Sequence, residues 1–331
     1  MEVQIKFFNN RQTDNWEYIM QVRITPFLKK LIDGGSSATA AQFEEVADVS
    51  KVVFDSQDPL GEELLYSPVK GLVHKYSNRV LWKVSYRCAA HCQFCTRVRQ
   101  IGTSEGDLSD QDIEAGLQYV KDHPEVDDVI LSGGDPLYTP RQATRILEGL
   151  SEISSVRVIR IGTRLPIHAP QSMSATPISG LLEKFASLGN DKACYLLLHI
   201  NHPDELAPEV QQALQVLMRM HITVLSQTVF LRGINDDVHI LQELFRALYY
   251  LGIIPYYIYR CDYVQGLERF VCDLAVEREI MTTLRQTMSG IAVPTYIADV
   301  PGTGKIPVPL GFWEVPNINQ CRDFKGESID L

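Results

Sequence analysis

From residue 79 onward, short β-branched runs alternate with amphipathic segments, and this alternation limits the folds open to the chain. It is typical of a parallel sheet whose strands are connected by helices. The sequence predicts strands at residues 79–88, 126–132, 156–162, 194–200, 222–230 and 253–260. It predicts helices near residues 109–122, 140–150, 177–188, 204–219, 237–251 and 274–288. Six such units can form an open doubly wound sheet or a curved partial barrel, since right-handed crossovers satisfy both.

Polar side chains gather at the carboxyl ends of the predicted strands. They are Cys88, residues 132–135, Arg164, residues 199–202, Gln227 and Asp262. Parallel barrels place their catalytic groups at this end. We therefore expect an α/β fold built on a partial (β/α)6 TIM-like barrel.

The segments on either side of this barrel, taken as residues 71–290, differ from it in composition. Residues 1–70 are expected to form a helical appendage, with helices around 13–33 and 39–54, and to be a candidate surface for homo-oligomer formation. After residue 290 the alternation is expected to stop, and residues 291–331 include the Gly- and Pro-rich stretch ADVPGTGKIPVPLGF. Such a stretch predicts a loop that is ordered only when something holds it.

Net charge and cysteine content narrow the class of protein. The 331 residues carry a formal net charge of -10, which argues against nucleic acid as a partner and favours a small-molecule substrate. The sequence contains no apolar run of about 18 residues and no recognisable signal peptide, so we expect a cytoplasmic protein that does not bind membranes. In a reducing compartment, clustered cysteines are metal ligands or reactive groups more often than disulfides.

Three of the seven cysteines, Cys88, Cys92 and Cys95, form a C-x3-C-x2-C motif directly after the first predicted strand. Three thiolates at this spacing suit a zinc ion or an iron–sulfur cluster. A structural zinc site would need a fourth ligand, which His91 could supply only if the short loop folded back on itself. A cluster held by three cysteines keeps one iron open to a substrate or cofactor.

The C-x3-C-x2-C motif resembles that of the radical S-adenosylmethionine enzymes, and further segments resemble the lysine 2,3-aminomutase family among them. These segments are CTRVRQIG, ILSGGDPL, IRIGTRLP, HINHPDE, SQTVFLRGIND and PYYIYRCD, and they follow one another in the family's order. The resemblance implies a [4Fe-4S] cluster, S-adenosylmethionine, pyridoxal 5'-phosphate and an external one-electron reductant of the flavodoxin or ferredoxin type. It implies an isomerase that moves the α-amino group of L-lysine to Cβ and yields β-lysine.

The resemblance also implies roles for individual residues. Lys305, in PGTGKIP, would attach pyridoxal phosphate, although Asp299 to Lys305 is one glycine shorter here than in the family. Ser132, Gly133, Gly134, Asp135, His199 and Asn201 would contact S-adenosylmethionine. Lys75, Arg79, Arg164 and Gln227 would bind the phosphate of the second cofactor. From the residues alone, Lys305 can equally be a solvated lysine, Asp135 a turn-forming residue and His199 a structural group.

Substrate recognition follows from three charged residues. Arg97 matches the family position that pairs with the substrate carboxylate, and Asp262 and Asp299 match the pair that binds the distal ammonium. Two buried carboxylates without a cation are costly, so the pair by itself implies a basic substrate. Arginine and ornithine remain alternatives to lysine.

Three further alternatives stay open. One is a radical enzyme without pyridoxal phosphate, and another is a zinc-stabilised binding module. A third is an aminomutase that serves modification of translation elongation factor P, because the segment KYSNR at residues 75–79 resembles that branch of the family.

Overall fold

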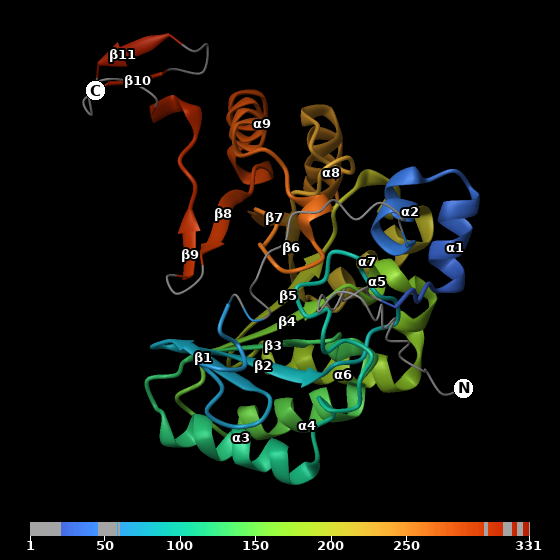
Figure 1. Cartoon of the computed structure of the whole chain (residues 1–331). Helices are drawn as coiled ribbons and strands as arrows, with labels where there is room; N and C mark the ends of the chain where they lie inside the picture. The colour runs from blue at the N-terminus through green and yellow to red at the C-terminus, as the bar shows by residue number, and fades with distance from the viewer. Residues whose placement is uncertain are drawn as a thin grey trace, which may run out of the picture.

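The computed structural model describes residues 21–45, 58, 60–300, 304–313, 320–322 and 327–330. Its centre is a curved nine-stranded sheet in the order β1 to β9 (Figure 1). The strands are β1 Leu72–Tyr76, β2 Arg79–Ser85, β3 Asp128–Gly133, β4 Val158–Thr163, β5 Ala193–His199, β6 Thr223–Val229, β7 Ile254–Tyr259, β8 Thr295–Val300 and β9 Gly304–Pro307. Strands β2 to β8 run parallel, whereas β1 and β9 pair antiparallel at the two edges.

Helices connect the strands and cover the outer face of the sheet (Figure 1). The helices are α1 Pro26–Asp33, α2 Ser37–Phe43, α3 Asp110–Asp122, α4 Pro140–Ser151, α5 Leu165–His168, α6 Thr176–Leu188, α7 Pro208–Arg219, α8 Val238–Tyr250 and α9 Leu274–Thr287. Short 3-10 turns include η1 Pro136–Tyr138 and η3 Pro203–Glu205, and β10 Gln320–Arg322 pairs with β11 Ser328–Asp330. None of the described helices is long and apolar enough to cross a bilayer.

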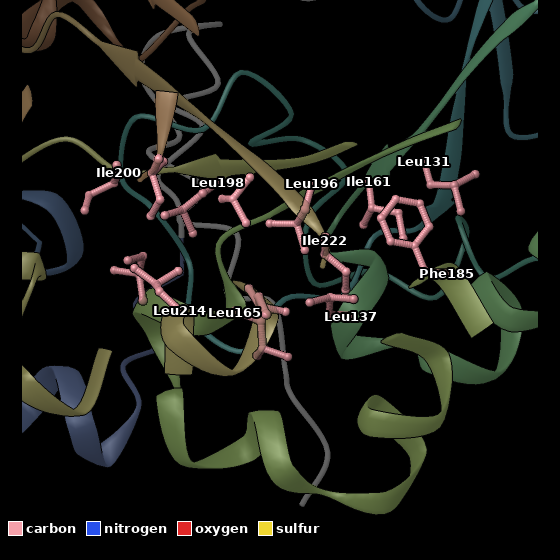
Figure 2. Close-up of a cluster of buried hydrophobic side chains, with 14 of the residues drawn as sticks. Leu131, Leu137, Ile161, Leu165, Phe185, Leu196, Leu198, Ile200, Leu214 and Ile222 are labelled. Atoms are coloured by element: carbon pink, nitrogen blue, oxygen red, sulfur yellow. The ribbon is translucent and has the colours of Figure 1, made fainter. Parts of the chain in front are cut away.

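The main core lies between the outer face of the sheet and the helices. Alternate strand residues such as Leu131, Ile161 and Leu196 are fully buried in one cluster with Phe185 of α6 (Figure 2). Trp82 of β2 lies so close to Gly116 of α3 that an added Cβ would approach its ring to 2.3 Å. Because side chains alternate along a strand, the residues between these core positions face the concave side. The concave side is where the polar residues collect.

The predicted partial barrel is confirmed, and its six predicted strands are β2 to β7. One expectation is wrong: the pattern does not stop at residue 290, because β8 pairs in parallel with β7 and β9 turns back along β8. The sequence TYIADV is short and runs into Gly and Pro residues, so its strand signal is weak. Strand β1 was not predicted either. The division at residues 70 and 290 stays a prediction.

The N-terminal helices are shorter than expected. α1 lies within the predicted stretch 13–33, and α2 begins two residues before the predicted stretch 39–54. Residues 13–20 and 46–54 lie outside the described residues. α1 and α2 each begin with a capping side chain, since Thr25 accepts from Leu28 N–H and Ser36 accepts from Thr39 N–H, each at 3.2 Å.

The two edges of the sheet meet through a polar contact. The backbone N–H of Lys305 on β9 donates to the Tyr76 hydroxyl on β1 at 3.1 Å. Beside it, Lys75 Nζ lies 3.4 Å from Asp299 Oδ1 on β8. Gly304 has a φ of 99°, and an added Cβ would approach the Tyr76 hydroxyl to 2.7 Å, so glycine is required where the edges touch. The barrel is thereby bridged at one level by its first and last strands.

Candidate active site

The loop after β2 carries the three clustered cysteines, all of which are free thiols. Burial raises the pKa of each thiol, to about 12 for Cys95, and the other cysteines add to the increase for Cys88 and Cys95. The three thiols are therefore close enough to influence one another electrostatically. A buried set of thiols becomes a set of thiolates only when a cation balances the charge.

The three cysteines are compatible with an iron–sulfur cluster. Among the described residues, no three His, Cys, Asp or Glu side chains are placed to share one metal ion. His91, the candidate fourth zinc ligand, points its Nδ1 at the carbonyl oxygen of Gln21, 2.9 Å away. In an iron–sulfur cluster each thiolate binds a different iron atom, so the sulfurs need not converge on a point. The donor set of three thiols without His fits such a cluster.

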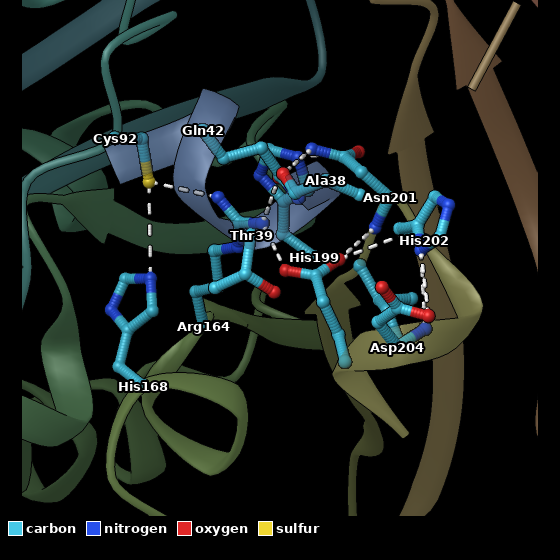
Figure 3. Close-up of polar contacts among 12 residues, drawn as sticks. Ala38, Thr39, Gln42, Cys92, Arg164, His168, His199, Asn201, His202 and Asp204 are labelled. Atoms are coloured by element: carbon cyan, nitrogen blue, oxygen red, sulfur yellow. Dashed lines mark hydrogen bonds and ion pairs between the residues drawn. The ribbon is translucent and has the colours of Figure 1, made fainter. Parts of the chain in front are cut away.

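A buried polar network surrounds Cys92, and its centre is Arg164 (Figure 3). Arg164 Nη1 donates to Cys92 Sγ at 2.9 Å, and Nη2 donates to Gln42 Oε1 at 2.6 Å and to Glu205. The guanidinium lies 5.1 Å from the ring centroids of both Phe43 and Phe94. The sequence predicts that Arg164 binds a phosphate with Lys75 and Arg79, and this stays a prediction. Both of its terminal nitrogens are committed beside the cysteine loop.

His168 approaches Cys92 from the other side. Its Nε2 lies 3.8 Å from Cys92 Sγ (Figure 3), and its Nδ1 is buried without a hydrogen-bond partner among the described residues. Burial, with Arg164 as the next cause, holds the pKa of His168 well below its usual value. The imidazole is therefore neutral, and Arg164 supplies the positive charge next to Cys92.

Replacing Arg164 with methionine is expected to lower the free energy of unfolding by about 3–5 kcal/mol, because Glu205 would be left as a buried carboxylate without its cation. Glu205 is fully buried, and its other oxygen accepts from Asn201 N–H at 2.7 Å and His202 N–H at 2.9 Å. Urea denaturation of the cluster-free protein measures the change. The exposed Arg141, 3.8 Å from Asp110, is a matched control, and its change to methionine should cost less than about 1 kcal/mol. A loss below about 1 kcal/mol for Arg164→Met would mean that Glu205 is not isolated from water.

The end of β3 is fixed by contacts within the chain. An added Cβ on Gly133 would approach Ser85 O to 2.5 Å, and one on Gly134 would approach Arg87 O to 2.2 Å. The sequence predicted that these glycines let a ligand come close. The structure gives another reason for them, which is the close packing of β3 against the end of β2. Ser132 lies one position earlier, with Lys83 as its Cα partner on β2.

Asp135 has the turn-forming role. Its Oδ1 accepts from Leu137 N–H at 3.0 Å and so caps η1, and its carboxylate also accepts from the Thr163 hydroxyl at 2.7 Å and Arg164 N–H at 2.8 Å. Burial raises the pKa of Asp135 and these hydrogen bonds oppose the increase. Asp135 therefore ties the ends of β3 and β4 together.

His199 and Asn201 lie at the end of β5, in the same network as Arg164 (Figure 3). His199 Nε2 is 3.1 Å from Asn201 Oδ1, and Asn201 Nδ2 donates to Gln42 at 3.1 Å. Burial, followed by the charge of Arg164, lowers the pKa of His199 to about 3, so its ring is neutral. Gln227 on β6 is the Cα partner of His199. The structure thus brings together His199, Asn201 and Gln227.

Lys305 lies on strand β9, and not on the loop that the sequence predicted. Its Nζ donates to the Tyr259 hydroxyl at 3.0 Å and lies 5.0 Å from the centroid of the Tyr259 ring and 6.0 Å from that of Tyr257. Although the residue as a whole is exposed, its amine is enclosed, and burial lowers the pKa of Lys305 while Asp299 opposes the decrease. A lowered pKa makes an amine a better nucleophile near neutral pH.

Asp262 and Asp299 lie near each other and near Lys305. Burial raises the pKa of Asp262 to about 7, and the charge of Asp299 is the next cause, while Lys305 opposes it. Asp299 is the register partner of Lys305 across β8 and β9 and also pairs with Lys75. The predicted pair of acidic residues is therefore present, next to the predicted reactive lysine.

Two cations accompany this group. Arg79 stacks over the Tyr76 ring at 4.0 Å. Arg160 on β4, which the sequence analysis missed, pairs with Asp128 at 2.9 Å. Burial raises the pKa of Tyr259 and lowers that of Lys305, and the charge of Arg160 has a smaller, lowering effect on both. A signal existed in VIRIGT, where an arginine stands between two buried isoleucines and must face the concave side. Together with Lys75, these two arginines are cations that an anion bound near Lys305 could use.

Arg97, which follows the cysteine loop, is paired within the chain. Its Nε and Nη2 donate to the two carboxylate oxygens of Glu62 at 2.8 and 2.7 Å. Burial raises the pKa of Glu62, but Arg97 outweighs it and the net shift is downward. Glu62 is a second residue near the site that the sequence analysis missed.

Comparison with known proteins gives consistent results. The profile of the Radical SAM superfamily matches residues 82–244. The chain is 36% identical over 311 residues to the L-lysine 2,3-aminomutase of Clostridium subterminale, covering 92% of this chain and 71% of that enzyme. It is 36% identical over 314 residues to the L-lysine 2,3-aminomutase of Fusobacterium nucleatum, covering 93% and 72%. A crystal structure of a radical SAM methyltransferase from Sphaerobacter thermophilus shares the fold, with a TM-score of 0.50 and 16% identity over 69% of this chain and 68% of that one.

Proposed function

Because the chain belongs to the lysine 2,3-aminomutase family of radical S-adenosylmethionine enzymes, it is an isomerase, and we propose that it moves the α-amino group of a basic amino acid to Cβ. L-Lysine is the first candidate substrate and β-lysine its product. The observation that carries the proposal is the pair Asp262 and Asp299 beside the amine of Lys305. As a radical S-adenosylmethionine enzyme, it uses an iron–sulfur cluster, S-adenosylmethionine and an external reductant.

Cys88, Cys92 and Cys95 would hold the [4Fe-4S] cluster. When bound, the cluster and S-adenosylmethionine supply a carbon radical that removes a hydrogen atom from the substrate. The chain's own contribution is electrostatic, because Arg164 donates to Cys92 and favours its thiolate. Ser132, Gly133, Gly134, His199 and Asn201 would line the S-adenosylmethionine site at the carboxyl ends of β3 and β5.

Lys305 would hold pyridoxal phosphate covalently, and the contacts of its amine fit this role. When bound, the cofactor supplies an aldehyde for the amines and a π-system that delocalises an unpaired electron. Lys75, Arg79 and Arg160 would bind its phosphate, with Gln227 on the facing side of the barrel. Tyr259 holds the free amine through its hydroxyl until the cofactor arrives.

The substrate would be fixed at both ends. Arg97 would bind the α-carboxylate, while Asp262 and Asp299 would bind the distal ammonium. Because burial and Asp299 raise the pKa of Asp262 to about 7, an arriving ammonium would relieve the repulsion between the two carboxylates. A site built around a charged group rejects analogues that lack it by about 10^4-fold. Glutamate would therefore be a poor substrate.

An anaerobic assay of the reconstituted enzyme tests this function. L-Lysine, L-arginine, L-ornithine and L-glutamate are supplied separately with S-adenosylmethionine and dithionite, and the β-amino acids are separated by chromatography. We expect product from lysine. If glutamate reacts and the three basic amino acids do not, the assignment of Asp262 and Asp299 is wrong. If omission of pyridoxal phosphate leaves the rate unchanged, Lys305 has another role.

The KM for lysine is expected to fall as pH rises through about 7, since Asp262 is protonated below its pKa and can attract an ammonium only when ionised. Asp262→Asn should raise KM at pH 8 about 10- to 100-fold, through loss of a charge-assisted hydrogen bond. It should also remove the change in KM around pH 7. The measurement is KM between pH 6 and 8.5, with the exposed Asp191→Asn as the matched control. An unchanged inflection in Asp262→Asn would assign it to another group.

A further inference from the structure

Glu62 holds one side of the Arg97 guanidinium. The two side chains are only 16% and 17% exposed, and their contact is a fork of two hydrogen bonds, at 2.8 Å from Nε and 2.7 Å from Nη2. The turn that carries Glu62 is itself fixed, because the Asp58 carboxylate accepts from the N–H groups of residues 62, 63 and 64 at 2.9, 2.9 and 3.1 Å. Glu62 therefore reaches Arg97 from an ordered turn.

The bidentate contact leaves Nη1 of the guanidinium to other partners. Glu62 uses the edge formed by Nε and Nη2, so the edge formed by Nη1 and Nη2 remains. Nη1 lies 3.4 Å from the carbonyl oxygen of Gly133, at the end of β3. A planar guanidinium fixed on one edge has its second edge fixed too. Glu62 thus aims Arg97 at the carboxyl end of β3.

Lys83 adds a second positive charge to this region. It lies on β2, opposite Ser132 in register, and is only 3% exposed. Its Nζ has no hydrogen-bond partner within the described part of the chain and lies 5.8 Å from the Tyr86 ring centroid. Glu62 and Arg97 are the largest charge effects on the pKa of Lys83 after burial, so the three groups are electrostatic neighbours. Glu63 and Asp58 also act on Lys83, but less strongly than Glu62 and Arg97.

We propose that Glu62 and Lys83 complete the carboxylate site of Arg97, with Glu62 as the residue that orients the guanidinium and Lys83 as the cation that offsets the charge of Glu62. The ligand class is a carboxylate on an amino acid. This inference rests on the proposed role of Arg97 as the group that binds the substrate carboxylate.

The two residues have opposite effects on carboxylate affinity. The charge of Glu62 repels an incoming carboxylate across the guanidinium, so its removal strengthens binding, while Arg97 loses its fixed direction. A small misplacement of the reacting atoms costs about 10^2-fold in rate. Removal of Lys83 takes away positive potential and weakens binding. A merely structural role for either residue would not produce opposite signs.

The experiment compares L-lysine with L-lysinamide, which lacks the carboxylate charge. Calorimetry on enzyme loaded with the cluster and pyridoxal phosphate, without S-adenosylmethionine or reductant, gives Kd in the absence of turnover. For lysine we expect Glu62→Gln to tighten Kd about tenfold and Lys83→Met to weaken it about tenfold. For lysinamide both changes should stay within about twofold. In turnover, Glu62→Gln should lower kcat about 10^2-fold, and Glu62→Asp, which keeps the charge, should restore part of kcat.

Glu63→Gln is the matched control, since Glu63 pairs with Arg99 at 3.1 Å and does not contact Arg97 in the described residues. Shifts of the same sign in both variants, or equal shifts with lysinamide, would overturn the inference. So would a wild-type enzyme that binds lysine and lysinamide equally. If lysine is not turned over and another amino acid is, the proposed substrate is wrong. The comparison is then made between that amino acid and its amide.

Discussion

Lys305→Ala is expected to lower amino transfer by at least about 10^3-fold while leaving the iron content of the enzyme unchanged. The physical reason is that the variant lacks the amine with a lowered pKa that lies beside Asp262 and Asp299. The hydrogen bonds of Lys305 go to Tyr76 and Tyr259, so the cysteine loop would keep its own contacts. Anaerobic turnover and iron analysis of the same preparation provide the two measurements.

A chemical experiment separates a covalent role of Lys305 from an electrostatic one. Borohydride treatment of enzyme loaded with pyridoxal phosphate should fix the cofactor to the peptide that contains Lys305 in the wild type only, and peptide mass spectrometry identifies it. Lys121→Ala, on the surface helix α3, is the control and should behave as the wild type. If another lysine carries the cofactor, the assignment of Lys305 fails even if its variant is inactive.

Serine at position 88, 92 or 95 is expected to reduce bound iron to a small fraction of the wild-type content and turnover by at least about 10^3-fold. An alcohol does not replace a thiolate as an iron ligand under these conditions, and burial already disfavours a charge at these positions. Iron and sulfide analysis with the visible spectrum of the reconstituted protein measures the loss.

The other cysteines supply the matched controls for this experiment. Cys272 is buried in the described structure, and Cys194 is partly exposed on β5. Alanine at either position should leave the iron content unchanged. Full iron content in Cys92→Ser would show that the cluster does not use this thiol, and the hydrogen bond from Arg164 would need another explanation.

The fold could be predicted from the sequence because the strands show period-two burial and the helices show their own spacing. In β3, for example, Val129 and Leu131 are buried while Ile130 and Ser132 face the concave side. Local pattern could not reveal β8 and β9, since β8 is stabilised by pairing with β7 and β9 by pairing with β8, and not by their own composition.

Only the part of the site that is encoded locally in the sequence could be predicted. Cys88, Cys92 and Cys95 are neighbours in sequence, so their grouping could be expected. The contacts of Arg164 could not be predicted, because its partners Gln42 and Glu205 lie 122 and 41 residues away and no local pattern connects them. Glu62 was missed for this reason too, since its partner Arg97 is 35 residues away.

The contact between β1 and β9 would give the proposed cofactor a structural role. Lys305 and Tyr76 are 229 residues apart, yet they join the outermost strands of the sheet through a single hydrogen bond. A molecule bound covalently to Lys305 on β9 and by an ionic contact to Lys75 on β1 would link these two strands. Binding of the cofactor would then stabilise the contact between the two edge strands.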